Sequence, residues 1–381
     1  MNPPFTWAEK FLLLIRLTFL IPWTLLYYVS TFLVISTYRG LPIRRYLTCA
    51  FLKVILLKFT SRQIQYLSAP TRKVYQKWIR RKNARAGEPE ASLVRGRLSD
   101  DVEPLRDGRS ALLWVGNRHA AKKFVLFFHG GGYVAPMLPG HLEWCWRSYV
   151  EAGVETGIET AVAVLEYTLC PEAQYPVQLG QAVDAFSHLL ESGIQPQNLI
   201  IGGDSAGGNL AAQLIGHLCD HTPPIAPVNL QRPLAGVFLV SPWLSDKFAD
   251  ESFMENDHID MLSKGLEKRH RVYYLGLLSV EHSLSTSHVR AFPVDGDLSY
   301  LKNMSRVVKE MYVTAGNEEV FRDQVVRYGS EVSQANPSLK VRLDIQKDMA
   351  HDFILLEGQD RVNGPCIREM KMWAKMVITE A

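Results

Sequence analysis

Two glycine-rich segments of this chain hold residues that could carry out covalent acyl transfer. In the first, residues 201–210, an apolar approach leads into Gly-x-Ser-x-Gly, with Ser205 between Gly203 and Gly207. A reactive serine on a sharp strand-to-helix turn needs small neighbours, because the turn leaves little room for side chains. A tight turn without chemistry would contain the same glycines, so the flanking elements decide between the two interpretations.

The residues around Ser205 predict a strand, a turn and a helix in that order. Residues 198–202 are a short apolar run typical of a buried strand, and residues 209–215 contain good helix formers. A serine in this setting is placed as a nucleophile. We therefore predict that Ser205 is the nucleophile.

The second segment is a continuous apolar run, residues 124–128, that stops at the His129–Gly132 motif. A buried strand that ends in glycines exposes backbone N–H groups, which can stabilise a developing oxyanion. We expect the N–H groups of Gly131 and Gly132, together with that of Ala206, to form an oxyanion hole.

A serine nucleophile also needs a histidine base and a carboxylate that orients the base, in the chain order serine, acid, histidine. Residues 307–314 predict a strand, and the loop and helix start after it contain three competing carboxylates: Glu318, Glu319 and Asp323. Residues 341–345 predict the last strand. His351 lies just beyond that strand, which is why it is favoured over the other histidines as the base.

Together these motifs resemble the hormone-sensitive-lipase group of α/β-hydrolases, and within it the membrane-anchored arylacetamide deacetylases and fungal steryl acetyl hydrolases. Residues 167–172 are similar to that group's Tyr-x-Leu-x-Pro-Glu segment. The resemblance covers about residues 95 to 380. It implies Ser205 as nucleophile, His351 as base and Glu319 in place of the usual aspartate, with Glu318 and Asp323 still open as alternatives.

The predicted fold is an α/β-hydrolase domain over residues 96–381, with a mostly parallel central sheet and helices on both faces. A helical cap is expected around residues 244–301, including a helix over 264–278. Residues 238–243 predict a further strand that ends at the same edge of the sheet. Tyr133 and Trp243 adjoin the expected site and are candidate substrate contacts, although either ring could belong to the core.

The predicted function is that of a serine carboxylesterase or deacetylase that works through an acyl-enzyme and requires no metal or organic cofactor. The resemblance implies a small acyl group, acetyl above all, on a lipophilic alcohol such as a sterol, a terpenoid or another secondary metabolite. Two alternatives are an amidase on the same triad, either an aryl-amide deacetylase or a formamidase, and a non-catalytic ligand-binding receptor. His351 argues against the receptor.

The front of the chain predicts a membrane anchor. After a tail, residues 1–16, residues 17–38 carry no charge and would form a helix of about 33 Å, enough for a hydrocarbon core of about 30 Å. A helix lying in the membrane surface and a packed cap helix are the alternatives. The resemblance implies a single pass in the endoplasmic reticulum with a lumenal domain, whereas basic residues after the span favour a cytosolic one.

Residues 39–95 are expected to form a basic juxtamembrane and cap segment. From Lys10 to Gly87 there are 15 lysines and arginines and no acidic residue, in a chain whose net charge is +3. Such a segment favours anionic lipid headgroups. No recognition motif for nucleic acid accompanies it, so membrane lipids are the predicted partner. The five scattered cysteines do not predict a disulfide scaffold.

Overall fold

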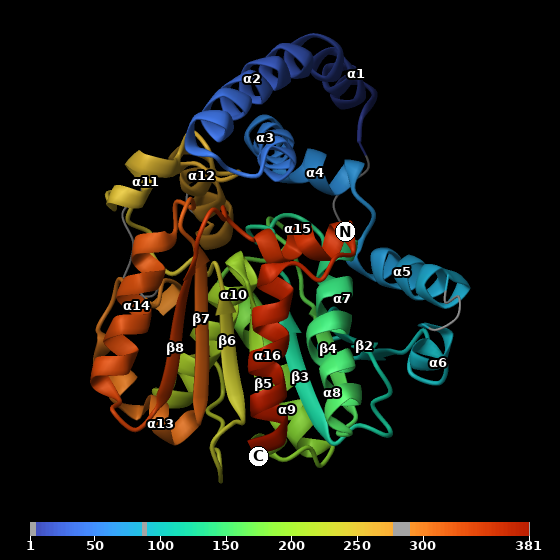
Figure 1. The fold of residues 1–381 in the computed structure, drawn as a ribbon, viewed down its shortest axis with the longest axis vertical. Helices are drawn as coiled ribbons and strands as arrows, with labels where there is room; N and C mark the ends of the chain where they lie inside the picture. Colours follow the sequence, from blue (N-terminus) through green and yellow to red (C-terminus); the bar gives the residue numbers. More distant parts are fainter. Residues whose placement is uncertain (1–4, 86–89, 277–289, 381) are drawn as a thin grey trace.

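The structure is a computed structural model that describes residues 5–85, 90–276 and 290–380 (Figure 1). Within these residues the core is an eight-stranded sheet in the order β1-β2-β4-β3-β5-β6-β7-β8. The strands are β1 (Val102–Pro104), β2 (Ala111–Val115), β3 (Lys123–Phe128), β4 (Thr160–Glu166), β5 (Leu199–Asp204), β6 (Gly236–Val240), β7 (Glu310–Gly316) and β8 (Lys340–Gln346). From β4 to β8 the neighbours are parallel, and β1 and β2 form an antiparallel edge.

The central strands are apolar along their whole length because helices cover both faces of the sheet. Strands β5 and β6 are buried at every position. In Figure 1, α8 and α16 cross one face, and α9 and α10 lie behind the sheet. Parallel strands bring their carboxyl ends to one edge, so the loops after β3, β5, β7 and β8 meet there.

The helices of the catalytic domain are α7 (Pro139–Cys145), α8 (Glu151–Thr156), α9 (Val177–Glu191), α10 (Ser205–Cys219), α11 (Glu251–Asn256), α12 (Lys264–Leu275), α13 (Met304–Val307), α14 (Arg322–Ala335), α15 (Phe353–Asp360) and α16 (Pro365–Glu380).

Two strand boundaries predicted from the apolar pattern were wrong. The strand expected over 307–314 begins at Glu310, because the short helix α13 precedes it and is held by the Ser305 N–H, which donates to Asn336 Oδ1. The strand expected over 238–243 ends at Val240. The next residue, Ser241, turns the chain with a φ of 44°.

The N-terminal region is helical over most of its length. The helix α1 (Trp7–Ile15), a π-helical stretch (Arg16–Leu20) and α2 (Ile21–Arg39) form one continuous helix of 33 residues. Among the described residues, this is the one helix long and apolar enough to cross a membrane. It contains the predicted anchor, 17–38, and begins ten residues before it.

Four helices follow over the segment expected to be basic: α3 (Ile43–Lys58), α4 (Ser61–Leu67), α5 (Thr71–Arg85) and α6 (Glu90–Val94). In Figure 1, α1 and α2 form the outermost layer, above α3 and α4 and over the end of the domain that carries α12 and α15. Helices α11 and α12 lie within the expected cap. The helix predicted over 264–278 ends at Leu275, and its last two expected positions lie outside the described residues.

Candidate active site

Ser205 lies at the sharp turn between β5 and α10. Its φ of 51° places it in the left-handed region, which L-residues adopt rarely. A Cβ atom added to Gly203 or Gly207 would lie 2.2 or 2.0 Å from the carbonyl oxygen of Phe128. The two glycines are therefore required by the neighbouring strand β3, as expected for a strained nucleophile turn.

The structure brings His351 to Ser205. His351 follows β8, and its Nε2 lies 2.9 Å from Ser205 Oγ. Both residues are buried, with exposed fractions of 2% for His351 and 7% for Ser205. This is the distance and the dry setting in which an imidazole can take the proton of a hydroxyl as it attacks a carbonyl.

Glu319 faces the other nitrogen of the same imidazole. Its Oε1 lies 3.8 Å from His351 Nδ1, and neither atom has a hydrogen-bond partner in the described part of the chain. Glu319 Oε2 is fixed by the Ser241 hydroxyl at 2.7 Å and by the Gly316 N–H at 2.8 Å. The gap between Glu319 Oε1 and His351 Nδ1 exceeds hydrogen-bond length, and catalytic hydrogen bonds are often long before substrate binds.

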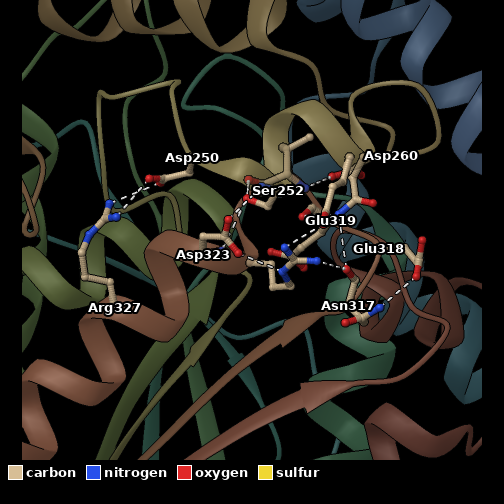
Figure 2. A network of polar contacts seen from close by, with 12 residues as sticks. Asp250, Ser252, Asp260, Asn317, Glu318, Glu319, Asp323 and Arg327 are labelled. Carbon is tan, nitrogen blue, oxygen red and sulfur yellow. Dashed lines mark hydrogen bonds and ion pairs between the residues drawn. The ribbon is translucent and has the colours of Figure 1, made fainter.

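The two alternative acids form their hydrogen bonds with other residues, and neither contacts His351 in the described part of the chain. Figure 2 shows Glu318 beside Asn317, whose amide donates to it at 2.9 Å, and Asp323 beside Ser252, whose N–H donates to it at 2.8 Å. Asp323 also pairs with Arg322 at 2.9 Å. Of the three carboxylates left open by the sequence, the geometry favours Glu319.

Asp352 is a second carboxylate at the base that sequence reasoning missed. Its Oδ2 lies 3.2 Å from His351 Nε2, so the imidazole has a carboxylate near each nitrogen. Burial alone lowers the pKa of His351, but Asp352 and then Glu319 outweigh it and hold that pKa well above its ordinary value. Burial raises the pKa of Asp352. Asp352 is buried and has a φ of 53°, a left-handed backbone that the sequence did not indicate.

Asp260 connects the expected cap to the loops that carry Glu319 and His351. Its Oδ2 accepts the Val320 N–H at 2.8 Å, and its Oδ1 accepts the His351 N–H at 3.4 Å. Burial is the main cause that raises the pKa of Asp260, to about 6. It lies between α11 and α12, and its spacing from the motifs gave no signal for this role.

The glycine loop after β3 has the open backbone predicted for an oxyanion hole. Gly131 and Gly132 have φ values of 113° and 59°, and α10 begins at Ser205, so the Ala206 N–H lies in its first turn and has no acceptor within the helix. The cap covers this loop, since a Cβ atom on Gly132 would lie 2.2 Å from His270 Nδ1.

The side chain of His129 packs beneath the glycine loop that follows β3, against Tyr167. Its ring stacks on Tyr167 with centroids 4.6 Å apart, and its carbonyl oxygen accepts the Tyr167 hydroxyl at 2.8 Å. Burial lowers the pKa of His129 to about 4, so its imidazole is neutral near pH 7. His129 therefore supports the oxyanion loop and adds no charge to it.

Tyr133 and Trp243 lie in a buried aromatic cluster next to the site. The Tyr133 ring stacks on Tyr274 at 4.0 Å and its hydroxyl donates to Asn209 at 2.6 Å, while Trp243 packs on Phe292. Contact of either ring with substrate stays a prediction. Within the described residues, there is no group of three or more His, Cys, Asp or Glu side chains arranged to hold a metal ion.

Comparisons with known proteins agree with this arrangement. A family model described as the alpha/beta hydrolase fold matches residues 125–355. The chain is 27% identical to an acetyl-hydrolase of Streptomyces hygroscopicus over 218 residues, which are 57% of this chain and 64% of that protein. It is 31% identical to arylacetamide deacetylase-like 3 of Mus musculus over 144 residues, 36% of this chain and 32% of that protein.

A crystal structure of an esterase from the bacterial hormone-sensitive lipase family has a TM-score of 0.55 and 23% identity, covering 82% of this chain and 99% of that one. The matched segments thus span about a third to two thirds of the two curated relatives, and nearly all of the solved structure. The predicted resemblance is confirmed. Because the family match covers more than half of its length, this chain belongs to the α/β-hydrolase-fold family, in which the named relatives are esterases, acetyl-hydrolases and a deacetylase-like protein.

Proposed function

We propose that this protein is a serine carboxylesterase that removes a small acyl group, with acetyl as the favoured one, from a lipophilic alcohol. The observation that carries the proposal is the buried contact of 2.9 Å between Ser205 Oγ and His351 Nε2, with Glu319 on the far side of the ring. The Streptomyces and mouse relatives, named for acetyl and acetamide hydrolysis, support the acetyl preference.

The reaction begins when Ser205 Oγ attacks the ester carbonyl and His351 Nε2 takes the hydroxyl proton. The N–H groups of Gly131, Gly132 and Ala206 stabilise the oxyanion, and Glu319 stabilises the imidazolium. When the tetrahedral intermediate collapses, His351 returns the proton to the alcohol, which leaves. Water activated by His351 then attacks the acyl-enzyme, and Ser205 and the free acid are released.

The position of the cap supports a short acyl group. His270 lies so close to Gly132 that an added Cβ would be 2.2 Å from its Nδ1, and we infer that little space is left beside the carbonyl that would be attacked. Ser205 and His351 are both buried, so a substrate must leave water to reach them. This favours apolar substrates, for which transfer out of water is favourable. Sterol, terpenoid and other secondary-metabolite acetates fit this description. They are the substrate classes that we propose.

The catalytic proposal is tested with Ser205→Ala in the purified full-length chain and p-nitrophenyl acetate as substrate. We expect hydrolysis to fall to the background rate with the circular dichroism spectrum unchanged. Ser299→Ala, at an exposed serine in the 3₁₀ helix Leu298–Asn303, is the matched control and should keep full activity. Activity retained by Ser205→Ala would refute the assignment.

The lipophilic substrate is identified by comparing extracted lipids from cells that express the active chain or Ser205→Ala. Acetyl esters that accumulate with the inactive variant are the substrate candidates. Paired ester and anilide substrates of the same aryl group distinguish the esterase from the amidase alternative. Faster cleavage of the anilide would move the proposal to an aryl-amide deacetylase.

We propose that the protein acts at a membrane. Its resemblance to the membrane-anchored deacetylases favours the membrane of the endoplasmic reticulum. The 33-residue apolar helix and the basic helices after it support membrane lipids as partners. Co-fractionation of the full-length chain with reticulum markers tests the compartment. A chain found wholly in the soluble fraction would contradict it.

A further inference from the structure

The outer helix, defined as residues Trp7–Arg39, is held against the rest of the protein near its N-terminal end. Arg16 donates to the carbonyl oxygen of Lys58 at 3.0 Å and to Gln63 Oε1 at 3.2 Å. Leu13 is 4% exposed and packs into a small apolar cluster between α3 and α4. This part of the outer helix is therefore docked on the junction of α3 and α4.

The other end of the outer helix is docked on the catalytic domain. Arg39 donates to Glu318 Oε2 at 2.5 Å, in the loop that carries Glu319, and to Asn256 Oδ1 at 3.4 Å. Phe32 is fully buried and belongs to the main hydrophobic core. Contacts that tie the outer helix to the rest of the protein therefore lie at both ends of the apolar segment.

Helix α3, on which α2 packs, is itself fixed to the cap. The buried ammonium group of Lys53 donates to the carbonyl oxygens of Asp257 at 2.7 Å and Asp260 at 2.9 Å. Arg269 of α12 donates to the carbonyl oxygen of Leu57 at 3.0 Å. The outer helix, α3 and the cap are thus joined in a continuous series of contacts.

These contacts conflict with a helix that crosses the bilayer. Arg16 and Arg39 are 23 positions apart, about 35 Å along a helix, which exceeds a hydrocarbon core of about 30 Å. If this segment lay along the membrane normal, its two ends would be on opposite sides. One end contacts α3 and α4 and the other contacts the catalytic domain, and these parts are joined to each other by Lys53 and Arg269. Polar loops cannot pass through hydrocarbon. A helix parallel to the membrane surface satisfies both sets of contacts.

The outward side of the helix is suited to lipid. Its six most exposed large apolar side chains are Trp7, Phe11, Phe19, Trp23, Val34 and Tyr38, with exposed fractions from 64% to 91%, and further exposed leucines accompany them. Five hydroxyls donate to the carbonyl oxygen four residues earlier, namely those of Thr18, Thr24, Ser30, Thr31 and Thr37. These polar groups are satisfied without water, so they can enter an apolar layer.

We propose that the outer helix lies within one leaflet of a phospholipid bilayer, parallel to its surface, with the N-terminus and the catalytic domain on the same side. The proposal rests on the membrane association proposed above and replaces a single pass with a one-sided attachment. It also places lipid next to the site. Ala135, whose N–H donates to the Gly131 carbonyl at 2.9 Å, packs on the same apolar cluster as Leu13.

The topology is tested in microsomes with the full-length chain carrying a glycosylation tag at the N-terminus and a second tag at the C-terminus. One-sided attachment predicts that both tags are modified or that neither is. Modification of one tag alone shows a crossing helix and overturns the proposal. A chain that does not sediment with the microsomes overturns the membrane association itself, so the two failures are distinguishable.

The face that enters the leaflet is tested by flotation on vesicles of phosphatidylcholine and phosphatidylserine. Trp23→Glu puts a charge on the outward face at a residue that is 74% exposed, and we expect vesicle binding to fall about tenfold or more. Met376→Glu, at an exposed position on α16, is the matched control and should float as the unmodified chain does. Both variants should hydrolyse soluble p-nitrophenyl acetate normally. Equal loss of flotation in both, or in neither, would refute the assigned face.

Discussion

The hydroxyl of Ser241 donates to Glu319 Oε2 at 2.7 Å, and this bond fixes which oxygen of the carboxylate faces His351. The same hydroxyl oxygen accepts the Asp352 N–H at 3.3 Å. Ser241 comes directly after β6 with a φ of 44°, so the end of one strand orients the carboxylate-bearing segments on both sides of the imidazole. Ser241 is thus a positioning residue for the proposed triad.

Replacing Ser241 by alanine should lower kcat/KM for p-nitrophenyl acetate about 10- to 100-fold, because a hydrogen bond to a charged group contributes about 1.5 to 3 kcal/mol. The fall should appear in kcat more than in KM, since the serine does not face the ester. Steady-state kinetics measure both constants. An unchanged kcat would show that Glu319 is held without this bond.

Glu319→Gln should cost about a thousandfold or more in kcat, because the amide cannot stabilise the imidazolium that forms during the reaction. Asp323→Asn and Glu318→Gln are the matched variants. Both side chains bond to other partners, so each variant should retain most of the activity. A larger loss of kcat in Asp323→Asn than in Glu319→Gln would assign the role of the triad acid to Asp323.

The pH dependence reports the two carboxylates at the base. His351 acts as a base only when neutral, and its pKa is raised, so kcat/KM should increase with pH through a range above the ordinary histidine pKa. Asp352→Asn removes one charge that raises this pKa and should move the acidic limb of the profile to lower pH. A limb that stays in place would show that Asp352 does not act on His351. Asp360→Asn, exposed on α15, is the control.

Gly132→Ala should reduce activity far more than its backbone strain alone explains. The added Cβ would lie 2.2 Å from His270 Nδ1, so either the oxyanion loop or α12 must move. Gly157→Ala provides the comparison, because Gly157 also has a positive φ, 71°, but an added Cβ there meets no atom within 4 Å. Gly157→Ala should lose about 1 kcal/mol of unfolding free energy from backbone strain. Gly132→Ala should lose about 1 to 3 kcal/mol more because of the clash, and it alone should lose about a hundredfold or more in kcat/KM.

Equal kinetic effects in the two glycine variants would contradict the assigned role of the oxyanion loop. Denaturant unfolding followed by circular dichroism separates loss of activity from loss of stability.

The sequence was sufficient to predict the residues that local motifs define. Ser205 and the glycine loop could be found because strand, turn and helix follow one another within a few residues. The start of β7 could not be predicted. Val307 ends α13 and Val308 follows it, but both residues are apolar and buried, as the residues of a central strand would be. A short apolar run without periodic alternation does not distinguish a buried helix end from a buried strand.

Features that depend on contacts between residues far apart in the chain, or on backbone conformation, could not be predicted from the sequence. Asp352 is next to His351 in the chain, yet its approach to Nε2 depends on a left-handed backbone that no local motif required. The direction of the outer helix depends on Arg16 and Arg39 meeting partners that lie 42 or more positions away. Apolar length alone predicts an anchor and leaves its orientation open.

The central claim is that Ser205 becomes acylated with His351 as its base. The most direct test mixes the full-length protein with excess p-nitrophenyl acetate, quenches in acid within the first turnover and maps the modified peptide by mass spectrometry. The account predicts one acetyl group on Ser205, and none when Ser205→Ala or His351→Ala is treated in the same way. Acetyl on another residue, or the same labelling in Ser205→Ala, would contradict it.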